Sequence, residues 1–256
     1  AEWTYRTTGP AGEEPYGPSD WYLGYPDCAS DSQSPINLAA SLIKVAEVRH
    51  SDSDDDSGIE FNESFCESTD LTFKADFAVW QVNFDACPNQ PYLKWHGEVY
   101  NLLQVHINSP SEHLFGGAER DAEIQMMHLK EGTADELLVV GILLDASEYG
   151  VSFAVQNSFE VLARGDTTTT GMFTIPPYEI LPQSPSYTHY MGSLTTPPCS
   201  EGVQWIVMNE AIRIGKRQLM QFRQAVEDFP GSKASEEGNT NRPAQALNGR
   251  DLTYVP

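Results

Sequence analysis

The uninterrupted apolar run from Leu137 to Leu144 constrains the fold of this chain more than any other segment. A strand of this kind has to be covered on both faces, so it belongs in the interior of a wide sheet. Three further segments, 78–84, 99–107 and 203–208, are rich in β-forming residues. We therefore predict a β-dominated α+β fold around one large sheet, as a single domain over residues 1–256.

Helices are expected to be few and short. The stretch 216–229 has helical spacing in Leu219, Phe222 and Val226, and Pro230-Gly231 follows it. No apolar stretch approaches the roughly 20 residues of a membrane span, so we expect no membrane insertion.

The charge balance is strongly acidic, with 37 Asp and Glu against 15 Lys and Arg and a formal net charge of −22. Such a surface repels phosphates, so we expect no nucleic-acid partner. It suits a halotolerant protein, because salt screens self-repulsion, and it equally suits a cation, a protein or a glycan partner whose identity the sequence does not give. The acidic run 52–57 is expected to be a solvated loop, since it lacks the spacing of a calcium-binding loop.

The cysteine count is even, with Cys28, Cys66, Cys87 and Cys199. This fits an oxidising compartment, and four cysteines allow three pairings. Asn62-Glu63-Ser64 is an acceptable glycosylation sequon. We expect a secreted or extracellular protein, or one from the lumen of an oxidising organelle.

Several short segments, taken in order, carry a family resemblance. They are Gln33–Asn37, His106–His113, Ala122–His128, Tyr190–Cys199 and Arg242–Gln245. With this order and spacing the chain resembles the α-class carbonic anhydrases along nearly its whole length. The resemblance implies a single domain with a large central, twisted and mostly antiparallel sheet, and a cone-shaped site that reaches the middle of that sheet.

The resemblance also implies a disulfide between Cys28 and Cys199, which would brace the loop that carries Thr195. Cys66 and Cys87 have no general role in the family. A second, local disulfide between them and a pair of free or intermolecular thiols are both open interpretations.

In the family, three histidines bind the catalytic zinc, and the resemblance places those positions at His106, Asn108 and Gln125. Zinc lowers the pKa of a bound water to about 7 and so supplies hydroxide at neutral pH. One imidazole and two neutral amides make a poor zinc site, because zinc prefers imidazole or thiolate. We therefore expect no metal and no other cofactor, and we expect that carbon dioxide hydratase activity has been lost.

The residues around these positions match the family better. Gln104 matches the residue that orients the first zinc ligand, and Glu123 matches the partner of the third. Thr195, next to Thr196, matches the hydroxyl that orients zinc-bound hydroxide, and Glu112 matches the carboxylate that accepts its hydrogen bond. The apolar wall for carbon dioxide corresponds to Val139, Leu194, Val203 and Trp205.

Two more positions bear on activity. His128 matches a structural histidine of the family, and strand alternation puts it on the face opposite Gln125. The proton-shuttle histidine of the family falls near Ala78, so that role is absent as well.

The remaining site residues also fit purely structural roles. Glu112 and Thr195 fit buried hydrogen bonds that hold two loops together. His106 fits a hydrogen-bonded core histidine. Asn108 and Gln125 are open to a hydrogen bond with each other or with a trapped water.

Three functional hypotheses follow. The leading one is a carbonic anhydrase-related protein without hydratase activity, a pseudoenzyme that serves a binding or structural role. The second is a degenerate but active zinc-dependent carbonate dehydratase, a lyase, which is the one hypothesis that requires zinc. The third is an abundant acidic storage or extracellular-matrix protein.

Overall fold

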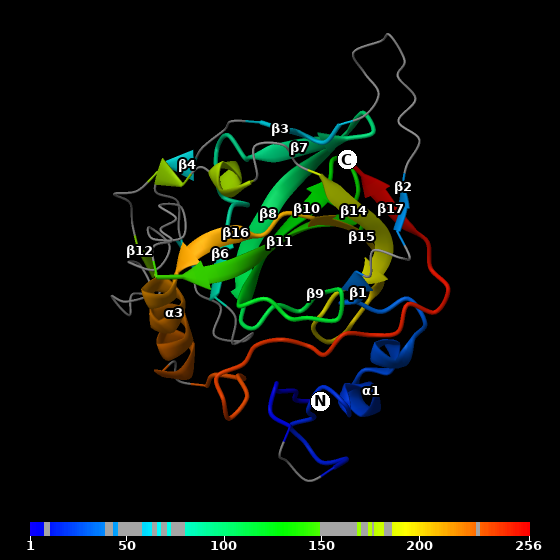
Figure 1. The fold of residues 1–256 in the computed structure, drawn as a ribbon, viewed down its shortest axis with the longest axis vertical. Helices are drawn as coiled ribbons and strands as arrows, with labels where there is room; N and C mark the ends of the chain where they lie inside the picture. Colours follow the sequence, from blue (N-terminus) through cyan, green and yellow to red (C-terminus); the bar gives the residue numbers. More distant parts are fainter. Residues whose placement is uncertain are drawn as a thin grey trace.

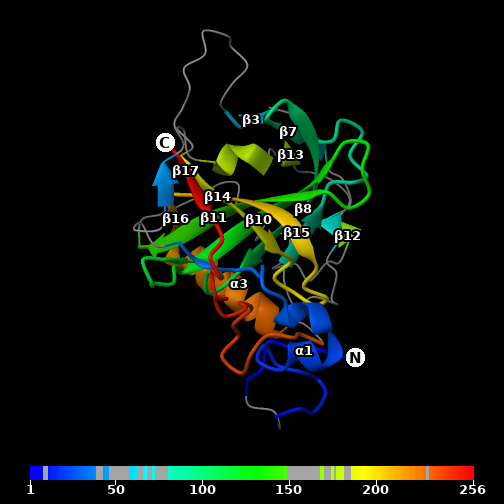
Figure 2. The ribbon, with the colours of Figure 1, turned by 90° about the vertical axis from the view of Figure 1, so that its right-hand side faces the viewer.

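The predicted buried strand lies inside the main sheet of the protein, for which we analysed a computed structural model. This strand, β11 (Leu137–Ser147), has buried residues throughout 138–144. Figures 1 and 2 show the curled sheet around it, with the helices at the periphery. The structure describes residues 1–7, 11–38, 43–45, 58–62, 66–67, 71–72, 80–148, 168–169, 174–175, 177–181, 186–228 and 231–256.

The sheet, as far as the structure describes it, has 11 strands. Besides β11, they are β2 (Ile43–Val45), β3 (Glu60–Phe61), β6 (Trp80–Asn83), β7 (Tyr92–Trp95), β8 (Glu98–Asn108), β10 (Ala122–Lys130), β14 (Tyr187–Ser193), β15 (Glu201–Met208), β16 (Ile212–Gly215) and β17 (Leu252–Val255). Their order is β2-β17-β14-β15-β11-β10-β8-β7-β3, with β16 beside β11 and β6 beside β8. Only β11 with β15, β11 with β16 and β17 with β2 pair in parallel within the described part of this sheet. The large, mostly antiparallel sheet is thereby confirmed.

The helices in the described part of the chain are few, as expected. They are α1 (Trp21–Gly24), the 3-10 helices η1 (Pro26–Ala29) and η4 (Pro177–Ile180), and α3 (Lys216–Asp228). Leu219, Phe222 and Val226 of α3 are buried in the main apolar core, as the helical spacing predicts. Among the described residues, no helix has the length and apolar character needed to cross a membrane.

Within the described ranges, three small strand pairs lie outside the main sheet. They are β1 (Asn37–Leu38) with β9 (Leu114–Phe115), β5 (Leu71–Thr72) with β12 (Thr168–Thr169), and β4 (Cys66–Glu67) with β13 (Thr174–Ile175). The strands predicted at 99–107 and 203–208 are present with slightly wider bounds. The one predicted at 78–84 is seen as β6, and residues 78 and 79, including the expected shuttle position Ala78, lie outside the described residues. The acidic run 52–57 also lies outside them.

The two faces of the sheet differ in chemistry where β8 and β10 pair. Ile124 and Met126 of β10 point into the main apolar core together with Phe222 of α3. The intervening residues Glu123 and Gln125 alternate to the other face. Polar side chains of β8 point to that same face, so it carries the candidate site.

Candidate functional site

His106 of β8 and Gln125 of β10 lie directly opposite each other in the strand register. Nε2 of His106 is 2.9 Å from Oε1 of Gln125, and Nδ1 is 3.1 Å from Oε1 of Gln104. Burial lowers the pKa of His106 to about 4, although the hydrogen bond to Gln125 acts in the opposite direction. His106 is therefore a neutral imidazole at pH 7, and side-chain amides occupy both of its ring nitrogens.

The Gln125 side chain joins this histidine to two buried carboxyl groups. Its Nε2 donates to Oε2 of Glu112 at 2.8 Å and to Oε1 of Glu123 at 3.1 Å. Gln125, Glu112 and Glu123 are each at most 2% exposed. The amide thus uses both of its N–H groups and its oxygen within the protein.

Asn108 lies two residues after His106 and pairs with Glu123 in the register of β8 and β10. Its side chain is 1% exposed, and Oδ1 has no hydrogen-bond partner. The sequence left open a hydrogen bond between Asn108 and Gln125. For Oδ1 of Asn108, this interpretation is wrong. The reason is that the two carboxyl groups and His106 already engage Gln125.

Glu112 links the site to two distant parts of the chain. Its Oε1 accepts a hydrogen bond from the backbone N–H of Arg242 at 2.8 Å, and its carboxyl group also hydrogen-bonds the side chain of Thr195. Burial and the nearby charge of Glu123 raise the pKa of Glu112 to about 8, while its hydrogen bonds act to lower it. Its neutral form is therefore favoured at pH 7.

Glu123 is ionised, in contrast to Glu112. Burial alone would raise its pKa, but the charge and hydrogen bonds of His113 and the hydrogen bond from Gln125 lower it. The chain of contacts continues from Nε2 of His113 to Oη of Tyr190 at 2.6 Å, and from there to Oγ of Ser34 at 2.8 Å. Sequence reasoning assigned no role to His113, Tyr190 or Ser34, although all three lie within the motifs that carry the resemblance.

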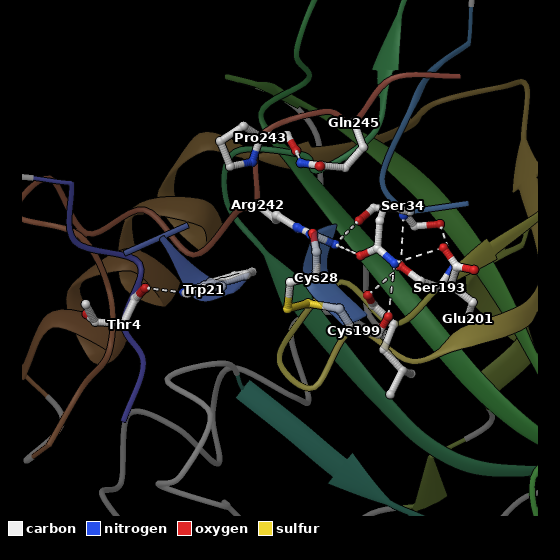
Figure 3. Close-up of a disulfide and its surroundings, with 12 residues drawn as sticks. Thr4, Trp21, Cys28, Ser34, Ser193, Cys199, Glu201, Arg242, Pro243 and Gln245 are labelled. Atoms are coloured by element: carbon white, nitrogen blue, oxygen red, sulfur yellow. Dashed lines mark hydrogen bonds between the residues drawn. A yellow bond between two sulfur atoms is a disulfide. The ribbon is translucent and has the colours of Figure 1, made fainter. Parts of the chain in front are cut away.

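The predicted disulfide between Cys28 and Cys199 is confirmed, with its sulfur atoms 2.07 Å apart. Figure 3 shows it beside Arg242, whose side chain reaches toward Ser34. The guanidinium donates to the backbone oxygens of Ser34 at 2.8 Å and Cys28 at 3.1 Å, and to Oε1 of Gln33 at 2.9 Å. Arg242 is a fourth residue to which sequence reasoning assigned no role, and its place in the segment Arg242–Gln245, which carries the resemblance, was the available signal.

The other pair of cysteines is described only in part. Cys87 is disulfide-bonded, and no cysteine is free among the described residues. The side chain of Cys66 lies outside them. The interpretation that leaves Cys87 as a free thiol is therefore wrong.

The residues expected to form the apolar wall lie together. Val139, Val203 and Trp205 are buried in one cluster, and the partly buried Leu194 and Met127 pack against it. The structure places Thr195 in the buried interior and Thr196 in a partly exposed position. On β6, Gln81 pairs with His106 in the register and donates to Oδ1 of Asn83. Alternation within the predicted strand 78–84 was the signal for this additional pair of amides.

The donor set at the family's metal position does not fit zinc. In the described ranges, no group of three or more His, Cys, Asp or Glu side chains is placed to hold a metal. His106 supplies one imidazole whose Nε2 is hydrogen-bonded, and Asn108 and Gln125 supply amides, which are weak zinc ligands. His128 does not replace a ligand, because its Nε2 lies 3.0 Å from Oη of Tyr178, which packs against the main core on the other face.

The curled sheet and the site at its centre define a protein with the carbonic anhydrase fold. The family of eukaryotic-type carbonic anhydrases matches residues 16–256, and the chain belongs to this family. It is 32% identical over 253 residues to putative carbonic anhydrase 3 of Caenorhabditis elegans, covering 93% of this chain and 94% of the relative. It is 30% identical over 253 residues to carbonic anhydrase 7 of Mus musculus, covering 91% and 92%.

Solved structures agree with this assignment. The chain is similar to carbonic anhydrase Cah3 from Chlamydomonas reinhardtii in complex with acetazolamide, with a TM-score of 0.77, 29% identity and coverage of 97% of this chain and 99% of the other. It is also similar to the α-carbonic anhydrase of Thermovibrio ammonificans in complex with sulfanilamide, with a TM-score of 0.79, 25% identity and 99% coverage of both chains.

Proposed function

We propose that this member of the carbonic anhydrase family does not hydrate carbon dioxide and serves a binding or structural role. The observation that supports the proposal is the contact between His106 and Gln125. The single imidazole of the metal position is hydrogen-bonded through Nε2 at 2.9 Å to an amide that stands in place of a second ligand. Without a metal to acidify water, the site has no means of forming hydroxide at neutral pH.

The groups that would orient a hydroxide are nevertheless present. The hydrogen bond between Thr195 and Glu112 persists beside the apolar wall of Val139 and Trp205. In this protein, the bond joins two loops, and Glu112 also accepts a hydrogen bond from the backbone of Arg242. A structural role therefore explains these residues without catalysis.

The proposed partner is a cation or a basic macromolecule in an oxidising compartment. A net charge of −22 attracts such partners electrostatically. The disulfide between Cys28 and Cys199 supports a secreted or luminal location. The same negative charge also suits an acidic storage or matrix protein, which is the alternative within this proposal.

Stopped-flow hydration of carbon dioxide tests the proposal. Wild-type protein, incubated with zinc and then freed of excess metal, is expected to hydrate at the uncatalysed rate. The matched control is the double variant Asn108→His/Gln125→His, which restores three imidazoles and is expected to gain zinc and sulfonamide-sensitive hydration. Sulfonamide-sensitive hydration by the wild type would instead support the degenerate lyase and would end the proposal.

A further inference from the structure

We infer that Gln125 holds His106 in the tautomer whose Nε2 carries the hydrogen. Gln125 thus blocks the metal position, in addition to supplying no imidazole to it. The inference deepens the proposed function and rests on its claim that the protein works without zinc. It concerns the direction of two hydrogen bonds, which the surrounding groups determine.

The first step fixes the orientation of the Gln125 amide. Oε2 of Glu123 accepts hydrogen bonds from the backbone N–H groups of Glu112 and His113 at 3.0 and 2.8 Å. Oε1 of Glu123 accepts from Nδ1 of His113 at 2.8 Å and lies 3.1 Å from the Gln125 amide. A carboxylate surrounded by donors accepts hydrogen bonds and donates none. The NH₂ end of Gln125 must therefore face Glu123, and its oxygen must face His106.

The second step fixes the tautomer. The oxygen of Gln125 is 2.9 Å from Nε2 of His106 and accepts hydrogen bonds only, so Nε2 must donate. A neutral imidazole has a single N–H, and Nδ1 is then an acceptor. The amide of Gln104, 3.1 Å from Nδ1, supplies the donor when its NH₂ end is turned to the ring. Among the described residues, exchanging the two ends of that amide gives up a contact with the sulfur of Met127 at 3.6 Å, a weak acceptor.

The third step concerns metal binding. A metal needs the lone pair of the ring nitrogen that it approaches, with the hydrogen on the other nitrogen. In His106, the hydrogen is instead on Nε2, which is the ring nitrogen that faces position 125. Zinc would have to break the bond to Gln125 and move the ring proton before it could bind at Nε2. We call the hydrogen bond between His106 and Gln125 the lock. Oδ1 of Asn108 takes no part in it, because this atom has no hydrogen-bond partner.

Two single variants distinguish the effect of this lock on zinc affinity from the effect of the number of imidazoles. Asn108→His and Gln125→His each provide two histidines at the metal position, but only Gln125→His removes the lock. Zinc affinity is measured by competition with a chromophoric chelator. Because zinc at Nε2 of Asn108→His would break the lock and leave the buried oxygen of Gln125 without its donor, we expect Gln125→His to bind zinc about tenfold more tightly than Asn108→His. Equal affinities, or tighter binding by Asn108→His, would overturn the inference.

A second measurement uses the metal-free wild type and does not depend on how the variants fold. Two-bond ¹H–¹⁵N correlation spectra at neutral pH report which ring nitrogen of His106 is protonated. We expect a protonated Nε2 and a lone pair on Nδ1, and the same pattern in Asn108→His. A proton on Nδ1 alone, or on both nitrogens, would contradict the lock while leaving the proposed function intact. Hydration by the zinc-loaded wild type would instead contradict the proposed function, whatever the tautomer of the metal-free protein.

Discussion

Oη of Tyr190 lies 2.6 Å from Nε2 of His113, and both side chains are at most 1% exposed. Nδ1 of His113 donates to Oε1 of Glu123 at 2.8 Å, so the imidazole connects the phenol group to a buried carboxylate. The hydroxyl group of Tyr190 also hydrogen-bonds Oγ of Ser34 at 2.8 Å. Three segments of the chain are held together through this one phenol group.

Removal of the hydroxyl in Tyr190→Phe is expected to lower the free energy of unfolding by about 2–4 kcal/mol, because Nε2 of His113 and Oγ of Ser34 each lose a buried partner. Urea titration followed by tryptophan fluorescence measures the change. The matched control is Tyr22→Phe, since Tyr22 is 48% exposed. A loss no larger than that of the control would show that the network contributes little.

The raised pKa of Glu112 predicts an unusual dependence of stability on pH. The folded protein keeps a proton on Glu112 up to about pH 8, whereas the unfolded chain loses it near the ordinary value of 4.5. The folded state thus binds more protons in this window, and the free energy of unfolding must fall as pH rises. His106, His128 and His189, whose pKa values burial lowers, act with the opposite sign, and their effect fades only above about pH 7.5, where histidines of the unfolded chain have lost their protons.

The difference between the wild type and Glu112→Gln therefore isolates Glu112, because both proteins carry the same histidines. From pH 6.5 to 8, the free energy of unfolding of the wild type is expected to fall relative to that of the variant by up to about 1.4 kcal/mol per pH unit. Glu112→Gln has no proton to lose at this position, so its urea titrations report the remaining groups, whatever its absolute stability. A wild-type profile that runs parallel to that of the variant, or rises relative to it, would contradict a raised pKa at Glu112.

The disulfide between Cys28 and Cys199 spans 171 residues. By the chain-entropy relation, the double variant Cys28→Ala/Cys199→Ala should lose about 5 kcal/mol of unfolding free energy. Guanidinium titration under non-reducing conditions measures the loss and leaves the bond at Cys87 intact. A loss below about 1 kcal/mol would argue against a constraint on the unfolded chain.

Gly141 of β11 lies opposite Gln125 in the register, where a side chain has no room. A Cβ atom at this position would lie 3.2 Å from Oε1 of Glu123 and 3.5 Å from Val207. Gly141→Ala is expected to cost about 1–3 kcal/mol, measured by thermal unfolding, because overpacking shifts the carboxylate and its donors. Gly58→Ala, where a Cβ would meet nothing within 4 Å, is the control and should be close to neutral.

The main elements of the fold were predictable because their signals are local. The apolar run that forms β11 and the helical spacing of Leu219, Phe222 and Val226 each specify an element and its buried face. The pairing of Cys28 with Cys199 followed from the family resemblance, since four cysteines alone allow three pairings.

The contacts within the site were less predictable, because they depend on side-chain directions across strands. The motifs placed His106, Asn108 and Gln125 at one position, but they did not show that Gln125 would bridge Glu112 and Glu123 while Oδ1 of Asn108 stayed unpaired. The shift in strand register between Met127 and His128 is likewise invisible to simple alternation. Such details follow from packing rather than from residue type.

The most direct test of the account is the zinc content of the wild-type protein after equilibrium dialysis against micromolar zinc, determined by mass spectrometry of the metal. The expected value is far below one zinc per chain, with the Asn108→His/Gln125→His variant approaching one under the same conditions. One zinc per wild-type chain, lost on mutation of His106 to Ala, would contradict the claim that this site has become independent of metal.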